Sequence, residues 1–323
     1  MVANIAKNTN FEFVKRYNSF VGHYKEKYGE RLQKLVIDAG FTCPNRDGKV
    51  GLHGCTFCDN AAFHPGYSVP GKSILQQIDE GIEFHRGRYP RAQKYLAYFQ
   101  SFSNTYGSLE KMKRLYSEAL SHESVVGIVI GTRPDCVDEE KLDYIASLNG
   151  QGGSLPLAVV EYGIESCYDL TLKRINRGHD FECARRAVKM TAERGIEVGA
   201  HFILGLPGET RQMLLDQCGL INELPLTSVK FHQLQIIRNT PMESEFELCP
   251  QDFLRLGLDE YLDFVIDILE RLRPDLYIER VAGEVPPRFV KETQWGLIRN
   301  VQILNLLDKK LEERDTCQGR LCK

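Results

Sequence analysis

Three cysteines in one short stretch are the residues of this chain best suited to chemistry. Cys43, Cys55 and Cys58 form a C-x11-C-x2-C run within a segment rich in Gly, Asn, Asp and Pro. Those residue types favour turns over helix or strand, so we predict a loop. Apolar residues 35–37 precede the loop and predict a strand, which places the thiols at the carboxyl end of that strand.

Three interpretations of these cysteines stay open on the residues alone. Unpaired core thiols fit poorly, because Gly, Asp and Asn flank Cys55 and Cys58. A structural zinc site needs four ligands, usually as two close pairs, and the sequence has no second C-x-x-C. Cysteine thiolates also hold iron–sulfur clusters, and three thiolates leave one iron of a cubane open. The spacing therefore favours a cluster, with zinc as the alternative.

Composition describes an ordinary globular chain. Of 323 residues, 42% are hydrophobic and 26% charged. The net charge of -3 gives no general attraction for nucleic acid, so an RNA substrate would need a local basic patch. We find neither a signal-peptide core nor an apolar run of membrane-spanning length, which predicts a cytoplasmic protein without a membrane partner. In that compartment the ten cysteines are expected to be ligands or reduced thiols, and Cys317 and Cys322 in the tail are not expected to bind metal.

A regular alternation of strands and helices must position the cysteine loop. Strands recur about every thirty residues with a helix between them, which is typical of βα units in a parallel sheet. The predicted strands are 35–38, 95–99, 125–130, 157–162, 198–204 and 229–237. We predict a partial (β/α)6 TIM-type barrel over 35–245, an N-terminal extension over 1–34 that packs on the barrel, and a C-terminal helical region over 246–323. That last region includes helices over 253–272 and 295–314, with an extra edge strand near 276–281.

One motif match is treated as chance. Residues 66–73 fit the phosphate-binding pattern G-x4-G-K-[ST], and Ser73 with Gln76 predicts a helix start. That motif works when a buried strand precedes it, and residues 58–65 do not form a strand pattern.

In a barrel, side chains just after the strands converge on one mouth. Here these positions carry groups able to hold an amine, a carboxylate, ribose hydroxyls and a base. They are Gln100 and Ser101, Thr132 to Asp135, Glu165 and Ser166, His201 with Gly205 and Glu209, and His232 with Gln233.

The cysteine loop, with Phe57 inside its C-x-x-C, resembles that of radical S-adenosylmethionine (SAM) enzymes. The long first gap is similar to the clade containing the catalytic subunit of the elongator complex. Segments 132–135, 176–179, 201–208 and 237–241 support that clade. Within it, residues 38–48 and 98–100 resemble the small bacterial YhcC/YtqA-type proteins. The acetyltransferase domain of the elongator subunit is absent, so acetyl-CoA use is not implied.

The resemblance implies a role for each matching residue. Cys43, Cys55 and Cys58 would ligate a [4Fe–4S] cluster, and SAM would chelate its open iron. Gln100 would take the SAM amine, and Arg133, Arg174 or Arg177 the carboxylate, through a planar guanidinium fork. Glu165 and Ser166 would lie at the ribose, and Ile203 and Gly205 at the adenine. The implied SAM-binding set also includes Phe57, Ser101 and His232. Cys136 and Cys167 are candidates to quench a radical.

The implied activity is reductive cleavage of SAM to a 5′-deoxyadenosyl radical that abstracts hydrogen from a substrate. The electron would come from a donor such as flavodoxin or ferredoxin. Kinship to the elongator subunit suggests the C5 side chain of the tRNA wobble uridine as the substrate. The alternatives are a radical SAM enzyme acting on a small metabolite, a zinc-stabilised binding protein and a P-loop nucleotide hydrolase.

Overall fold

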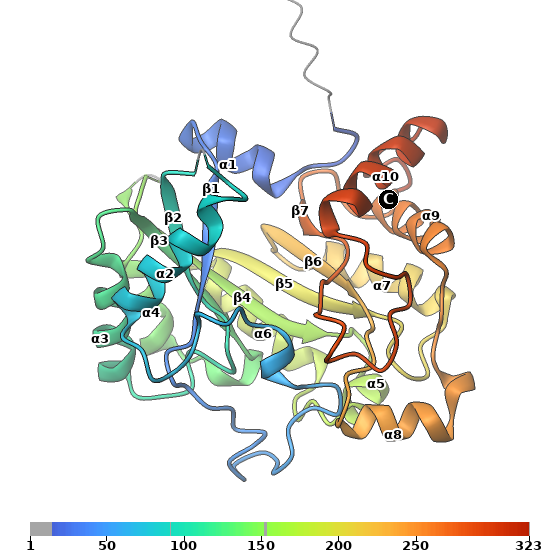
Figure 1. Ribbon diagram of the computed structural model, residues 1–323, viewed down its shortest axis with the longest axis horizontal. Helices are drawn as coiled ribbons and strands as arrows, with labels where there is room; N and C mark the ends of the chain where they lie inside the picture. The colour runs from blue at the N-terminus through green and yellow to red at the C-terminus, as the bar shows by residue number, and fades with distance from the viewer. Residues whose placement is uncertain (1–14, 91, 152–153, 323) are drawn as a thin grey trace, which may run out of the picture.

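A computed structural model describes residues 15–90, 92–151 and 154–322 of the chain. Its centre is a curved sheet of seven parallel strands that follow one another in chain order (Figure 1). The strands are β1 (Leu32–Ile37), β2 (Lys94–Phe99), β3 (Val125–Thr132), β4 (Leu157–Glu165), β5 (Glu197–Leu204), β6 (Ser228–Gln233) and β7 (Tyr277–Arg280). Six of these strands are the predicted ones and the seventh is the predicted edge strand. The partial barrel is therefore confirmed.

Helices surround the sheet, chiefly on its outer face (Figure 1). They are α1 (Phe20–Tyr28), α2 (Ile74–Arg86), α3 (Leu109–Leu120), α4 (Glu139–Ser147), α5 (Asp169–Arg174), α6 (Phe181–Ala192), α7 (Arg211–Asn222), α8 (Pro241–Leu248), α9 (Leu258–Leu269) and α10 (Asn300–Glu313). Several begin at the expected caps. The Ser73 hydroxyl accepts from the Gln76 N–H at 3.1 Å, and Thr210 caps α7 in the same way.

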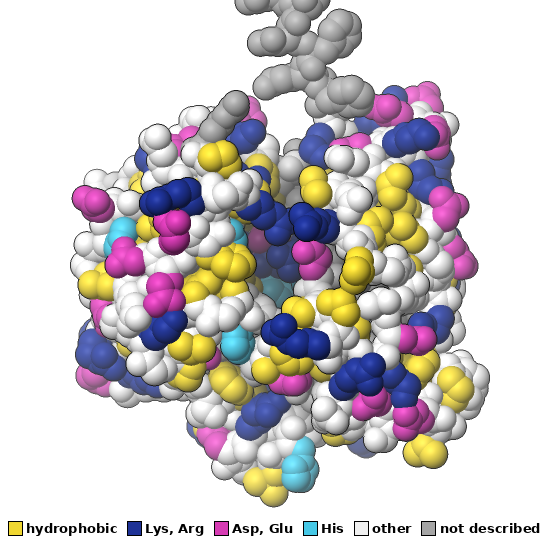
Figure 2. Space-filling model, in the orientation of Figure 1, with side chains coloured by type: hydrophobic (Ala, Val, Ile, Leu, Met, Phe, Trp, Pro, Cys, Tyr) yellow, Lys and Arg dark blue, Asp and Glu magenta, His cyan; other side chains and the backbone are white. Residues whose placement is uncertain are grey.

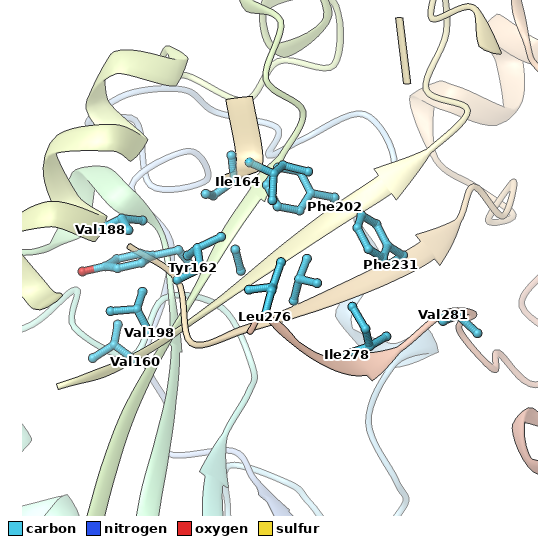
Figure 3. Close-up of a cluster of buried hydrophobic side chains, with 14 of the residues drawn as sticks. Val160, Tyr162, Ile164, Val188, Val198, Phe202, Phe231, Leu276, Ile278 and Val281 are labelled. Atoms are coloured by element: carbon cyan, nitrogen blue, oxygen red, sulfur yellow. The ribbon is translucent and has the colours of Figure 1, made fainter. Parts of the chain in front are cut away.

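The strands separate two apolar layers by the period of two that a strand imposes. Side chains on the outer face pack under the helices, and Figure 3 shows Val160, Tyr162, Phe202 and Phe231 in this layer. The alternate side chains point into the barrel. At its amino end that interior is apolar, formed by Phe20, Tyr24, Leu32, Leu96, Tyr98, Val129, Leu157 and Val159.

Helix α1 covers the gap between the two edge strands at the amino end of the barrel. Its Phe20 and Tyr24 belong to the interior apolar cluster. Just before the helix, Ser19 forms a parallel bridge with Ile278 of β7, and the Ile278 N–H donates to the Asn18 carbonyl at 2.7 Å. The first 14 residues of the predicted N-terminal extension lie outside the described residues.

Some predicted boundaries differ from the structure for local reasons. Strand β6 ends at Gln233 instead of residue 237, because the chain leaves the ladder and Ile237 bridges Val290 in antiparallel fashion. Helix α9 starts at Leu258, after Gly257 in an extended conformation, and α10 starts only at Asn300, after a turn at Gly296 with φ +70°. Helices α1, α5 and α8 were not predicted. The division at 34 and 245 stays a prediction, although β7 from the C-terminal region joins the same sheet.

In the part of the chain that the structure describes, no helix combines the length and the apolar character needed to span a membrane.

Candidate functional site

The cysteine loop, residues 43–58, follows β1 and lies beside α5 and α8 at the carboxyl ends of the strands (Figure 1). All three of its thiols line a cavity of about 250 Å³. The cavity is also lined by residues of β2 to β7. Figure 2 shows a hollow near the centre of the molecular face with Lys, Arg and His side chains inside it. The strand ends and the loop thus meet as the barrel prediction requires.

The loop is held by a segment far away in the sequence, residues 175–178. The Thr56 N–H donates to the Ile175 carbonyl at 3.0 Å, and the Asn176 amide donates to the Gly54 carbonyl at 2.8 Å. In return the Asn45 amide donates to the Asn176 carbonyl at 2.5 Å. Neutral hydrogen bonds between backbone and amide groups therefore fix the position of the C-x-x-C turn.

Guanidinium groups surround the thiols. Arg177 is buried, and its Nη1 lies 3.4 Å from the Cys55 Sγ. Arg46 donates to the Cys58 carbonyl at 2.8 Å. Burial, followed by the neighbouring Cys55, raises the pKa of the Cys58 thiol to about 11, and Arg46 opposes that rise. Metal binding needs thiolates, so cations beside the sulfurs favour the charged form that a cluster requires.

The donor set fits an anionic group bound in this cavity. Three thiols and four arginines, Arg46, Arg133, Arg177 and Arg280, line it. Two buried donors, the Arg133 Nη1 and the Arg177 Nε, have no hydrogen-bond partner among the described residues. Buried donors normally find a partner, which marks these two as available to a ligand. Among residues 15–90, 92–151 and 154–322, no three His, Cys, Asp or Glu side chains are grouped as a single metal ion would require.

Seven of the predicted SAM-binding residues line the cavity. They are Phe57, Gln100, Arg133, Glu165, Arg177, Ile203 and His232. Glu165 has a left-handed backbone at φ +73°, next to a bulge that shifts the β4–β5 register at Gly163. Such backbone strain concentrates at functional sites. A Cβ at Gly163 would lie 2.6 Å from the Glu165 Oε1 and 2.8 Å from the Arg177 Nη2, so a larger residue there would displace the ends of these two side chains.

The other predicted SAM-binding residues, Ser101, Ser166, Arg174 and Gly205, lie outside the cavity lining. Ser166 donates to Glu209 at 2.5 Å, and Arg174 pairs with Glu245 at 2.7 Å and also with Asp252. Gly205, at φ +93°, packs on the Leu254 backbone, and Ser101 is buried.

The two proposed radical quenchers are not among the residues that line the cavity. Cys136 and Cys167 are buried, and burial raises the pKa of Cys136 to about 12. Burial also raises the pKa of Cys167 far above its usual range. The structure does not bring either thiol to the cavity.

The segment that matches the phosphate-binding pattern has a structural explanation. Turns and a short 3-10 helix precede it, so the required strand is missing. Lys72 pairs with Glu80 at 2.5 Å, and Ser73 caps α2.

Sequence reasoning missed an ionic layer inside the barrel, formed by Lys34, Glu161, Lys230 and Glu279. The Glu161 carboxylate accepts from Lys34 and Lys230, each at 2.5 Å, and lies 3.0 Å from the His201 Nε2. Glu279 pairs with Lys34 at 2.6 Å and with Lys230 at 3.1 Å. The available signal was a charged residue at an inward position of an apolar strand, as with Glu161 in β4 and Lys230 in β6.

Electrostatics within this layer follow from burial and pairing. Burial opposes the charge of Glu161, yet Lys230 and Lys34 hold its pKa well below the usual range. Burial lowers the pKa of Lys230, and the two carboxylates oppose that shift. The layer separates the apolar amino end of the barrel from the cavity.

A parallel half-barrel with a three-cysteine loop at its mouth defines a class of α/β protein with a candidate cluster site. Comparison with known proteins identifies the family. The chain matches the family model described as "Radical SAM superfamily" over residues 48–218 and the "Radical_SAM C-terminal domain" over 226–313. It belongs to the radical SAM superfamily and is an enzyme of that superfamily. The alternatives of a zinc-stabilised binding protein and a P-loop hydrolase are therefore abandoned.

Particular relatives place the chain more closely within the superfamily. It is 33% identical to the uncharacterized protein YtqA of Bacillus subtilis, over 95% of this chain and 92% of that protein. The solved structure of Elp3 from Methanocaldococcus infernus superimposes with a TM-score of 0.66 at 16% identity, over 89% of this chain and 64% of that one. The predicted kinship with YhcC/YtqA-type and elongator-like proteins is confirmed.

A third relative carries a functional name. The "tRNA uridine(34) acetyltransferase" of Methanocaldococcus infernus is 30% identical over 33% of this chain, which spans only 18% of that protein. Membership of the superfamily implies a [4Fe–4S] cluster and SAM as cofactors, and a source of electrons.

Proposed function

We propose that this enzyme uses a [4Fe–4S] cluster held by Cys43, Cys55 and Cys58 to cleave SAM reductively and abstract hydrogen from a substrate. When bound, these cofactors supply the breakage of a C–S bond and a 5′-deoxyadenosyl radical. The observation that carries the proposal is the lining of one cavity by all three thiols and four arginines. An electron donor such as flavodoxin or ferredoxin completes the reaction.

The protein's own residues then hold and shield the reactants. Arg133 and Arg177 offer buried, unpartnered N–H groups for the SAM carboxylate. Gln100 and Glu165 at the strand ends are proposed to hold the amine and the ribose, with Ile203 against the adenine. The barrel walls exclude water from the reacting atoms.

The proposed substrate is the wobble uridine of tRNA, modified at its C5 side chain. Support comes from the likeness to Elp3 and to the tRNA uridine(34) acetyltransferase. An unpaired anticodon base can be turned out of its stack into a cavity at a barrel mouth. A small metabolite is the second candidate, favoured by the closed ionic layer beneath the cavity, which resembles a site for a compact polar molecule.

Anaerobic reconstitution tests the reaction. We expect a brown protein that forms 5′-deoxyadenosine from SAM and dithionite. Cys55→Ser should lose both the colour and the product, whereas Cys317→Ser, an exposed cysteine in the tail, should keep both. A colourless wild type, or product formation that survives Cys55→Ser, would refute the proposal.

Two measurements separate the substrates. tRNA binding should weaken steeply with salt, because phosphate contacts release counterions. Modified nucleosides should differ between cells with and without the protein. If tRNA binding is absent or insensitive to salt, the tRNA proposal is withdrawn.

A further inference from the structure

The floor of the cavity carries an excess of positive charge. We call His201, Lys230, His232 and Arg280 the floor cluster; all four line the cavity and come from β5, β6 and β7. Lys230 also belongs to the ionic layer, in which it and Lys34 pair with the two carboxylates Glu161 and Glu279. That layer has two charges of each sign, so Arg280 adds a positive charge that no ion pair with another described residue neutralises.

Arg280 is the last residue of β7, and it is exposed to the cavity. Across the described ranges, its guanidinium makes no ion pair and no side-chain hydrogen bond. Other cavity arginines differ, because Arg177 contacts Cys55 and Arg133 pairs with Asp135 at 2.7 Å. The guanidinium of Arg280 therefore offers its N–H donors to a ligand in the cavity.

The two histidines confirm how basic this corner is. Their ring centroids lie 6.0 Å apart. Burial, and then the charges of Arg280, His201 and Lys230, hold the pKa of His232 well below its usual range. Two carboxylates oppose these cations: Glu279 pairs with Lys230, and the two oxygens of Glu161 already lie within hydrogen-bond distance of Lys34, Lys230 and His201.

We infer that the floor cluster is a subsite for an anionic group of the substrate, a phosphate or a carboxylate, with Arg280 as its principal contact. The inference deepens the proposed function, since it assigns this anion to the substrate of that reaction. A guanidinium binds either anion through two parallel hydrogen bonds. A concave site with low-dielectric walls strengthens that attraction. The cluster lies deeper in the barrel than the cysteine loop, so a substrate anchored there has its remainder directed toward the thiols.

Equilibrium dialysis of the reconstituted full-length protein tests the subsite. Radiolabelled inorganic phosphate is the probe, at constant ionic strength, with and without saturating SAM. We expect saturable binding that persists with SAM present. Arg280→Ala should weaken it about tenfold, the loss expected for one charge-assisted contact. Arg280→Lys should fall between the two, because it keeps the charge and loses the fork.

Arg288→Ala is the matched control, since Arg288 is exposed, stacks on Phe289 and lies outside the cavity. It should bind phosphate as the wild type does. The inference is overturned if the wild type binds no phosphate, if Arg280→Ala and Arg288→Ala behave alike, or if SAM displaces the phosphate competitively. In that last case the floor would serve the cofactor.

Competition identifies the source of the anion. Displacement of phosphate by an RNA hairpin with uridine in its loop supports a nucleic-acid phosphate, whereas displacement only by succinate or a nucleoside monophosphate supports a small substrate. 5′-Deoxyadenosine formation by the wild type is measured on the same samples. Phosphate binding without that product would refute the proposed reaction but support the anion subsite. Product formation without phosphate binding would support the proposed reaction but refute the anion subsite.

Discussion

The cysteine loop and the ionic layer face the same cavity but are built in opposite ways. The loop is one contiguous segment, held by neutral hydrogen bonds from residues 175–178. The layer takes Lys34, Glu161, Lys230 and Glu279 from four different strands and holds them by ion pairs. Loss of a cysteine from the loop should abolish activity and leave the fold intact. Losing part of the layer removes support from the fold itself, because a buried charge then lacks its partner.

The largest effect on activity should come from the loop. Cys43→Ser is expected to reduce 5′-deoxyadenosine formation to background, because one iron ligand is lost. The fold should be kept, since the Cys43 side chain forms no hydrogen bond within the described residues. Product assay and thermal melting of the apo-protein measure both. A melting point that drops sharply would contradict the separation of chemistry from stability at the loop.

The largest effect on stability should come from the layer. Glu161→Gln leaves two ammonium groups beside a neutral amide and should cost about 3–5 kcal/mol of unfolding free energy. Val159→Ala, on the same strand in the apolar interior, is the control and should cost about 2 kcal/mol. Urea unfolding measures both. If Glu161→Gln costs less than Val159→Ala, ion pairing does not support the layer.

A pH-dependent effect separates two buried carboxyls. Glu161 has cations beside it, whereas burial raises the pKa of Glu209 to about 7, against the opposing hydrogen bond of Ser166. That pKa lies above the value near 4.3 of an unfolded glutamate, so the stability that Glu209 gives is complete at low pH and is lost as pH rises toward 7.

Glu209→Gln should therefore be more stable than the wild type by about 3 kcal/mol at pH 8, with the difference vanishing below about pH 4. Melting curves across that range provide the measurement. A difference that does not change with pH would show that Glu209 is charged in the folded protein.

The smallest effect belongs to the phosphate-binding pattern. Lys72→Ala breaks a partly exposed pair with Glu80, and such pairs contribute at most about 1 kcal/mol. We expect unchanged 5′-deoxyadenosine formation. Neither the wild type nor Lys72→Ala should bind ATP. ATP binding that disappears in Lys72→Ala would restore a role for the motif.

The same contrast explains what the sequence could reveal. The cysteine loop could be predicted because its three cysteines lie close together in the sequence. The strands could be predicted because each is a short apolar run. Glu161 and Lys230 are each a charged residue within a largely apolar strand. They are 69 residues apart in the sequence, and only the sheet register brings them together. Ser166 was placed at the cavity because it follows a strand end, and Arg174 because of the family resemblance. The sequence could not show that Glu209 and Glu245 engage them.

The position of helix α1 has a consequence for biosynthesis. The segment that leads into it bridges β7, and Lys15, Arg16 and Asn18 contact Asp308, Asp315 and Gln318 near the other end of the chain. These partners emerge from the ribosome about three hundred residues later. Residues 15–18 must therefore wait, undocked, until residues 308–318 have been translated, and helix α1 closes the amino end of the barrel after the strands have formed.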